Sequence, residues 1–402
     1  MIGEIETLLA ERARTVMPSA IREICKLCEQ PGMRSLAGGW PDPQTFPVER
    51  IKAIIADLLD SEANRCLQYT TSEGLGGLRQ WLAGWLKEND GLVCSPDELL
   101  ITHGSAQGME LAAKIFLEPG DVAFVGLPTY FGGTGACKTF GAKLVGVRVD
   151  PRDGLDGDEL EKKVESEQRA GRRPKLVYVI PDFDNPTGSC MPVESRKRLV
   201  EIAEKYNLII VEDSPYRDLY FDQPPPPPIK SFDRQGRVIF LRSFSKIFCP
   251  GFRLGLALGN AKIIRRMVIA RQFEDCCTAA FSQYVLELFC RRGYLEEQIR
   301  LNREFYRRKR DLLLDLLERH FPASVKWNRP GGGFFIWVEL PKDKDAEELL
   351  QKSLARQVAF VTGAPFFVDG SGRNTLRLSY AQASENELRQ ATVELGAVLK
   401  DI

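Results

Sequence analysis

The stretch Ser243-Phe244-Ser245-Lys246-Ile247-Phe248-Cys249-Pro250-Gly251-Phe252-Arg253-Leu254-Gly255 decides how the rest of the chain is interpreted. It follows the apolar run 238–241, which predicts a buried strand. A lysine does covalent amine chemistry only where burial or nearby positive charge populates its neutral form, and Lys246 lies in a candidate segment for this. Ser243, Ser245 and Arg253 are residue types that bind a phosphate. Taken alone, the segment suits a solvated lysine at a strand end equally well.

Length and charge exclude several classes of function. The chain has 402 residues, which allows two or three domains at roughly 100–200 residues each. Lysine plus arginine and aspartate plus glutamate both number 55, so the zero net charge gives no support for a nucleic acid or an anionic membrane as partner. The first 14 residues lack the apolar core of a secretion signal. No apolar run approaches the roughly 18 residues of a membrane span, so we expect no membrane association.

The ten cysteines show no metal or disulfide spacing, which suits a reducing cytoplasm. Cys25 and Cys28 form a CxxC, but no second pair or histidine cluster completes a metal site, so no metal is expected. The adjacent Cys276 and Cys277 suit buried thiols better than a disulfide. The proline run 224–228 predicts a stiff surface loop, and a proline-rich ligand for a partner is the alternative.

Strands and helices alternate along the middle of the chain. Apolar runs predict strands at 99–102, 122–125, 143–149, 175–180, 208–211, 238–241 and 254–259, with helical patterns between most of them. This alternation predicts an α/β fold whose large domain has a mostly parallel, doubly wound sheet with helices on both faces.

The C-terminal part has a different pattern. A helix is predicted at 294–320, strands at 331–340, 358–362 and 375–380, and helices at 346–357 and 385–399. These elements predict a smaller α+β domain, joined by an N-terminal segment with a helix at 17–30. We therefore divide the chain into an N-terminal segment of the small domain (1–47), a large domain (48–290) and a small C-terminal domain (291–402).

Polar clusters follow several of the predicted strands, at 104–107, 185, 213–216 and 243–246. Ligands of parallel sheets bind beyond the carboxyl ends of the strands, so these clusters should converge. The small residues at 104–107 begin a helix, which makes an anion site. Singly, each cluster also has a simpler explanation, such as a helix cap for Asp213 or a turn for Asn185.

Three motifs occur in a fixed order: Asp184-Asn185-Pro186-Thr187-Gly188, Asp213-Ser214-Pro215-Tyr216, and Ser243-Phe244-Ser245-Lys246 with Arg253. Together they resemble the fold-type I pyridoxal-phosphate enzymes, the class I and II aminotransferases, and are most similar to the aminoadipate and kynurenine aminotransferase subgroup. The resemblance extends over residues 22–380. It implies pyridoxal 5'-phosphate as cofactor and ping-pong transfer of an amino group from an amino acid to a 2-oxo acid, such as 2-oxoglutarate.

The resemblance also implies roles at the cofactor. Lys246 would form the Schiff base and then move the proton, and Asp213 would keep the pyridine nitrogen protonated. Asn185 and Tyr216 would contact the phenolate oxygen, and Tyr130 would stack on the ring. The phosphate would be held by Ser105, Ala106, Gln107, Ser243, Ser245 and Arg253. Ala106 stands where relatives often carry a polar residue, so its contact would rest on backbone N–H. The tyrosines could instead simply pack.

Further roles concern substrate and assembly. By family position Arg377 would clamp the substrate carboxylate with its planar fork, although a surface strand arginine is the alternative. Asn185 would also contact the substrate. Gly39 would let the N-terminal segment close over the substrate. Tyr69 would reach the phosphate of the neighbouring subunit in a homodimer. Arg22 would meet a distal substrate carboxylate or be a solvated helix residue.

Two rival functions remain. The same cofactor and fold could serve a lyase or decarboxylase, and nothing in the sequence excludes that outcome. A transcription regulator with an aminotransferase-like domain would carry a DNA-binding domain first. The short segment before Leu36 and the zero net charge argue against it.

Overall fold

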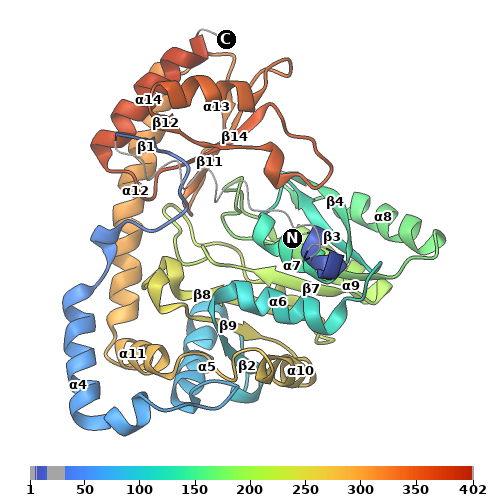
Figure 1. Ribbon diagram of the computed structural model, residues 1–402, viewed down its shortest axis with the longest axis vertical. Coiled ribbons are helices and arrows are strands. Elements are labelled where there is room, and N and C mark those ends of the chain that lie inside the picture. The colour runs from blue at the N-terminus through green and yellow to red at the C-terminus, as the bar shows by residue number, and fades with distance from the viewer. Residues whose placement is uncertain (1–4, 6, 16–31, 401–402) are drawn as a thin grey trace.

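A computed structural model describes residue 5 and residues 7–15 and 32–400 of the chain. It contains an eight-stranded sheet in the order β2-β9-β8-β7-β6-β3-β4-β5, a four-stranded sheet in the order β10-β11-β14-β13, and a two-stranded pair, β1 with β12. Figure 1 shows the two larger sheets as separate layers, with the long helix α12 running beside both.

The large sheet carries the predicted α/β fold. Its strands are Leu99–Thr102 (β2), Val122–Leu127 (β3), Lys143–Asp150 (β4), Gly154–Leu155 (β5), Pro174–Val179 (β6), Ile209–Asp213 (β7), Val238–Ser243 (β8) and Gly255–Leu258 (β9). The pairs from β4 through β3, β6 and β7 to β8 are parallel. β9 runs antiparallel to both β8 and β2, and β5 antiparallel to β4. The prediction of a mostly parallel sheet is confirmed.

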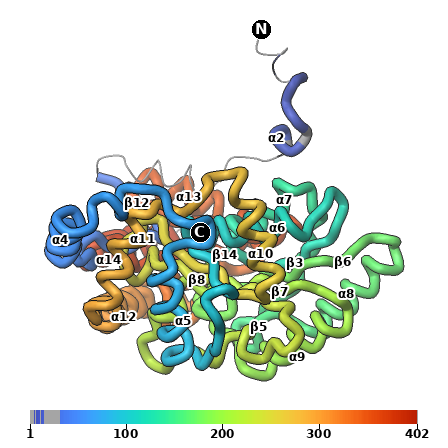
Figure 2. Tube along the Cα trace, turned by 90° about the horizontal axis from the view of Figure 1, so that it is seen from below, coloured from blue at the N-terminus to red at the C-terminus, as the bar shows by residue number. Residues whose placement is uncertain are grey.

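Helices cover both faces of this sheet, as a doubly wound fold requires. Those on one face are α6 (Gly104–Phe116), α7 (Phe131–Thr139) and α10 (Ala261–Gln272), and those on the other are α8 (Gly157–Arg169) and α9 (Val193–Tyr206). Figure 2 shows the two sets on opposite sides of the strands. Each face has its own hydrophobic core. In β3, Ala123 and Val125 pack in the core under α6, α7 and α10, and Val122 and Phe124 pack in the core under α8 and α9, because side chains alternate along a strand. Both faces are buried, which explains the continuous apolar runs.

The small sheet is antiparallel and built from β10 (Lys326–Trp327), β11 (Phe335–Glu339), β13 (Val361–Thr362) and β14 (Thr375–Ser379). The helices α13 (Ala346–Ala355) and α14 (Glu385–Lys400) belong to this part of the chain, and α12 (Tyr294–His320) packs on α14. Two more helices, α4 (Val48–Cys66) and α5 (Gly76–Asp90), each pack against α11 (Ala280–Arg291). The short helix α2 covers Glu11–Thr15. Near the start of the chain, β1 (Arg34–Ser35) pairs in parallel with β12 (Val358–Ala359).

Several details differ from the sequence predictions. The helix expected at 48–60 continues to Cys66, and the strand expected at 358–362 is two short strands, β12 and β13. The prediction that Cys276 and Cys277 are both buried was wrong for Cys276, which is exposed in a left-handed turn with φ 65°, although both are free thiols. The helix expected at 17–30 lies outside the described residues, and the domain boundaries stay predictions. Within the described ranges, no helix is long and apolar enough to cross a membrane.

Candidate active site

A cavity of about 540 Å³ opens where the carboxyl ends of the large-sheet strands face the small sheet. The polar clusters that follow β6, β7 and β8 all contribute to its wall, as does the start of α6. The lining residues are Gly39, Trp40, Gly104, Ser105, Ala106, Met109, Tyr130, Phe131, Gly132, Gly133, Tyr178, Ile180, Asn185, Asp213, Pro215, Tyr216, Ser243, Ser245, Lys246, Arg253, Phe335 and Arg377.

Lys246 lies on the 3-10 turn Phe244–Lys246 that directly follows β8. Its Nζ donates to the carbonyl of Gly39 at 3.1 Å. Burial, and then the positive charges of Arg253 and Arg377, lower the pKa of this amine to about 8. Such a lysine supplies neutral amine near neutral pH, which a solvated lysine does not.

Asp213 ends β7 with its carboxylate buried in the cavity wall. Oδ2 accepts a hydrogen bond from the Tyr178 hydroxyl at 3.1 Å, whereas Oδ1 has no hydrogen-bond partner among the described residues. Burial raises the pKa of this carboxyl to about 6, and the hydroxyls of Ser105 and Tyr178 oppose the rise. A buried, unsatisfied carboxylate oxygen is unfavourable unless a donor arrives, so Asp213 is suited to a protonated ligand nitrogen.

An anion cup forms where the start of α6 meets the segment after β8. Gly104 has φ +72°, and a Cβ there would lie 3.0 Å from Nη2 of Arg253, so a side chain would crowd the cup. The guanidinium of Arg253 donates to Ser245 Oγ and to the carbonyl of His103, at 3.4 Å each. Ser105 and Ala106, in the first turn of α6, present backbone N–H groups that an α-helix leaves unpaired.

Gln107 differs from its expected place. Its Nε2 donates to Asp275 Oδ2 at 2.6 Å, and its Oε1 accepts from the backbone N–H of His103 at 2.9 Å. The side chain is therefore engaged behind the cup and is not among the residues that line the cavity. In this structure Gln107 supports the loop that enters α6, and its contact with a phosphate stays a prediction.

Arg377 projects from β14 of the small sheet to meet the large sheet. Its Nη1 donates to Asn185 Oδ1 and its Nη2 to the carbonyl of Ala37, both at 2.7 Å. The guanidinium carbon lies 4.1 Å from the centre of the Phe335 ring. A planar guanidinium held by stacking and by fixed acceptors is preorganised for a carboxylate ligand.

Aromatic side chains make much of the remaining wall. Tyr216 is buried and packs edge-on to Phe335, with ring centroids 5.6 Å apart, and its burial raises the pKa of its hydroxyl. Tyr130 packs on Phe131 at 4.8 Å. The sequence analysis did not identify Tyr178 as a site residue.

It also overlooked Gly132 and Gly133, at the start of α7. A Cβ at Gly132 would meet the Tyr130 ring at 2.3 Å, and one at Gly133 would meet the Tyr178 ring at 2.2 Å. The paired glycines after Tyr130 were the available signal, because paired glycines mark a close approach.

Besides Gln107, one described residue that was expected at the site is not in the cavity wall. Tyr69 is 80% exposed and is not among the lining residues, so its contact with a neighbouring subunit stays a prediction. Arg22 lies outside the described residues. Gly39 does line the cavity, and a Cβ there would lie 2.8 Å from the Phe335 ring.

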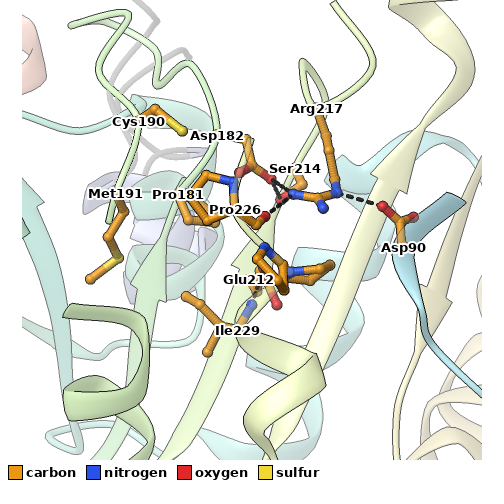
Figure 3. A network of polar contacts seen from close by, with 12 residues as sticks. Asp90, Pro181, Asp182, Cys190, Met191, Glu212, Ser214, Arg217, Pro226 and Ile229 are labelled. Carbon is orange, nitrogen blue, oxygen red and sulfur yellow. Dashed lines mark hydrogen bonds and ion pairs between the residues drawn. The ribbon is translucent and has the colours of Figure 1, made fainter. Parts of the chain in front are cut away.

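A buried network of ion pairs supports the strand ends. Asp182 accepts from Arg196 at 2.7 Å, from Arg217 at 3.1 Å and from the Ser214 hydroxyl at 2.9 Å. Arg217 also pairs with Asp90 at 2.5 Å, as Figure 3 shows. Ser214 directly follows Asp213, so the network holds the polypeptide that presents the cavity carboxylate.

The proline run completes this network. The carbonyl of Pro226 accepts from Arg217 at 2.8 Å and from Arg196 at 3.4 Å, and that of Pro227 accepts from Arg196 at 3.2 Å. The loop is thus at the surface, as predicted, but its carbonyls serve the protein interior.

Comparison with known proteins agrees with this geometry. Residues 38–395 match the model of the family described as aminotransferase class I and II. The chain is 39% identical to aromatic-amino-acid aminotransferase 1 of Thermococcus litoralis, over 99% of this chain and 95% of the relative. It is 37% identical to 2-aminoadipate transaminase of Thermus thermophilus, over 97% and 96%.

A solved structure gives the same result. The kynurenine aminotransferase of Pyrococcus horikoshii, in complex with PMP, superposes with a TM-score of 0.95 at 38% identity, over 100% of this chain and 99% of that one. Both the sequence and the fold are matched along essentially their whole length. The chain is therefore a member of the class I and II aminotransferases, enzymes that transfer amino groups with the aid of pyridoxal phosphate.

Proposed function

We propose that Lys246 is the amine that holds the cofactor and moves the proton, and that the preferred amino donor has an aromatic or large apolar side chain. One observation carries the first part: a lysine with a pKa near 8 and a carboxylate with a partnerless oxygen line the same cavity. The aromatic wall carries the second part.

The residues present fit pyridoxal phosphate. The partnerless Oδ1 of Asp213 would receive the protonated ring nitrogen. Ser105, Ala106, Ser243, Ser245 and Arg253 would hold the phosphate in the anion cup. Asn185 and Tyr216 would face the phenolate oxygen. When bound, the cofactor supplies an aldehyde that captures amines and a ring that withdraws electrons from the captured carbon.

The chain's own residues would then do three tasks. The Lys246 amine, neutral in a fraction of molecules near pH 8, would accept the proton from the donor's α-carbon and deliver it to the cofactor carbon that carried the aldehyde. Asp213 would remain ionised because the ligand nitrogen replaces its missing partner, which offsets its burial. Arg377 would fix the α-carboxylate, so that the donor's Cα–H bond faces Lys246.

Beside its polar site residues, the cavity wall carries large apolar side chains. Trp40, Phe131, Phe335, Met109 and Ile180 lie along it. Burying a large apolar side chain against such a wall is favoured by about 25 cal/mol per Å². A relative is named aromatic-amino-acid aminotransferase and a solved neighbour kynurenine aminotransferase, which supports an aromatic donor, whereas another relative is named for 2-aminoadipate, an acidic donor. For the second half of the cycle we propose 2-oxoglutarate as the acceptor.

The test is chemical trapping followed by a donor panel. After borohydride reduction of the cofactor-loaded protein, the peptide that contains Lys246 should carry the mass of the reduced cofactor. Lys246→Ala should abolish both this label and transamination, while Lys262→Ala, an exposed lysine on α10, should change neither. Normal transamination by Lys246→Ala would refute the assignment.

Single half-reactions then identify donor and acceptor. An aromatic amino acid should yield one equivalent of its 2-oxo acid per site, and 2-oxoglutarate should then yield glutamate. Release of ammonia instead of amino transfer would favour the lyase alternative. Preference for acidic donors, lost on substitution of Arg22, would overturn the proposed donor class.

We also propose a cytoplasmic homodimer. Leu67, Tyr69 and Phe273 are large side chains that are 68%, 80% and 86% exposed, and a partner subunit that covered them would bury apolar surface. Free thiols at every cysteine of the described part are typical of a reducing compartment. Sedimentation analysis should give twice the mass of the chain, and Phe273→Glu should reduce that mass to one chain.

A further inference from the structure

The segment at residues 36–42, here called the strap, crosses from the small sheet to the cavity. It begins where β1 ends: the N–H of Leu36 donates to Ala359, and the carbonyl of Leu36 accepts from Ser379, each at 2.7 Å. Ser379 ends β14, the strand that carries Arg377. Figure 1 shows the chain continuing from β1, past α12, to α4. The strap therefore starts as part of the small sheet's layer.

The middle of the strap contacts both cations that face the substrate. The carbonyl of Ala37 accepts from Arg377 at 2.7 Å, and the carbonyl of Gly39 accepts from Lys246 Nζ at 3.1 Å. The next side chain, Trp40, lines the cavity and is 45% exposed at its mouth. Any shift of the strap would move all three features together.

The strap ends in a buried ion pair. Asp42 Oδ2 accepts from Lys309 Nζ of α12 at 2.8 Å, and the two side chains are only 6% and 3% exposed. Lys309 also donates to the carbonyl of Ala381, at 2.6 Å, just beyond β14. The N–H of Asp42 donates to the Tyr306 hydroxyl at 2.9 Å. One ammonium group thus joins the strap, the long helix and the chain that follows Arg377.

Burying an ion pair at this position carries a free-energy penalty. Two buried charges lose hydration, and apolar residues of the same volume often pack there as well or better. What the ion pair adds is a fixed position of the strap relative to α12, because an ammonium group that donates to both a carboxylate and a carbonyl permits little displacement. Asp42 is two residues after Trp40 and three after Gly39. This ion pair, here called the joint, therefore also fixes the part of the strap that lines the cavity.

We propose that Asp42 and Lys309 are positioning residues, whose ion pair holds the strap so that Gly39 meets the Lys246 amine and Trp40 closes over the donor's side chain. This inference rests on the proposed function of Lys246 and of the aromatic wall. It predicts two effects of loosening the joint. The ammonium form of Lys246 loses an acceptor, so its pKa falls, and bulky donors lose a wall that small donors never touch.

The first test uses the apoprotein, and so does not depend on transamination. An acylating reagent modifies only neutral amines, and the rate at Lys246 is followed against pH by peptide mass spectrometry. In Lys309→Met and Asp42→Asn the midpoint should move to lower pH than in the wild type. Arg253 and Arg377 also face this amine and Tyr216 packs beside it, but none of them is changed.

The second test uses the loaded enzyme. Lys309→Met should raise KM for an aromatic donor roughly tenfold, while KM for alanine changes much less, because small misplacements of a substrate wall have effects of this order. Lys309→Arg, which keeps the charge, should restore most of the affinity. The control is Lys230→Met, which removes a largely buried pair with Asp233 that is not part of the cavity wall, and it should alter neither the midpoint nor the ratio of KM values.

The outcomes separate the inference from the proposed function. If Lys309→Met does not fold, Asp42→Asn, which keeps the volume of the side chain, provides the same measurements. A folded variant with the wild-type acylation midpoint and an unchanged ratio of KM values would overturn the role of the joint, even if transamination is normal. Absence of transamination in the wild type, with a shifted midpoint in the variants, would instead refute the proposed function and leave the joint standing.

Discussion

Replacing Asp182 by asparagine should lower the free energy of unfolding by about 3–5 kcal/mol, the usual cost of breaking a buried ion pair from one side. Asparagine preserves the shape of the side chain and one acceptor oxygen. It removes the negative charge that faces the guanidinium groups of Arg196 and Arg217, both of which are buried. The destabilisation would arise from those two cations.

The electrostatics of Asp182 lead to a similar magnitude. Burial opposes its ionisation, but Arg196 and Arg217 outweigh burial and lower its pKa from the usual 3.8 to about 2. A shift of that size corresponds to roughly 2–3 kcal/mol in favour of the folded state. Because the folded pKa is the lower one, this stabilisation is present above pH ~4 and is lost as the pH falls towards 2. Orphaned hydrogen bonds of the two guanidinium groups account for the remainder.

The assay is urea unfolding of the apoprotein at pH 7, followed by far-ultraviolet circular dichroism. The matched control is Asp315→Asn, which removes an i,i+4 pair on α12 with side chains 47% and 66% exposed, and should change stability by at most about 0.5 kcal/mol. A midpoint for Asp182→Asn as close to wild type as that of the control, with an unchanged denaturant slope, would refute the reasoning. It would mean that water or a rearranged loop satisfies the two arginines.

Two further predictions concern the cavity. Gly133→Ala places a Cβ 2.2 Å from the Tyr178 ring, so the ring must move and the hydrogen bond from Tyr178 to Asp213 is lost. Titration of this apoprotein with pyridoxal phosphate should show an affinity reduced about tenfold. The control Gly135→Ala, in open space on the same helix, should bind pyridoxal phosphate with normal affinity. Burial raises the pKa values of Asp184 and Glu212 to about 7, so the folded apoprotein retains protons that the unfolded chain releases. Its free energy of unfolding, measured by urea titration, should therefore fall as the pH rises from 5 to 7, by up to about 1.4 kcal/mol per pH unit for each group, and a rise would contradict this.

The layout of the fold was predictable because local signals agreed with one another. Apolar runs such as 122–125 and 238–241 are buried on both faces, and each marks a strand of the parallel sheet. The carboxyl-end rule then placed Asp213 and Lys246 together without knowledge of a single distance. The residue types and their order along the chain were enough to suggest pyridoxal-phosphate chemistry, without any distance between the side chains.

Features that depend on distant partners were not predictable. Gln107 is a residue type that can bind a phosphate, but in this structure its side-chain amide donates to Asp275, 168 residues later in the chain. The pair of Asp42 and Lys309 spans 267 residues, and neither residue lies in a motif. The strand β9 shows an ordinary apolar run, and its antiparallel position between β8 and β2 depends on pairing with a strand more than 150 residues earlier in the chain. In each case a tertiary contact decides between local alternatives that the sequence leaves equal.

The proline loop has a consequence for how this chain can vary. Arginine side chains only donate hydrogen bonds, and proline residues, lacking an N–H, only accept them. The loop and the two guanidinium groups beneath it are therefore matched in number and kind, with Arg196 and Arg217 drawing on the carbonyls of Pro226 and Pro227. Surface loops ordinarily gain and lose residues freely. Here a change in loop length would move the carbonyls of Pro226 and Pro227 away from the two guanidinium groups. The loop should therefore tolerate substitution of its side chains far better than insertion or deletion.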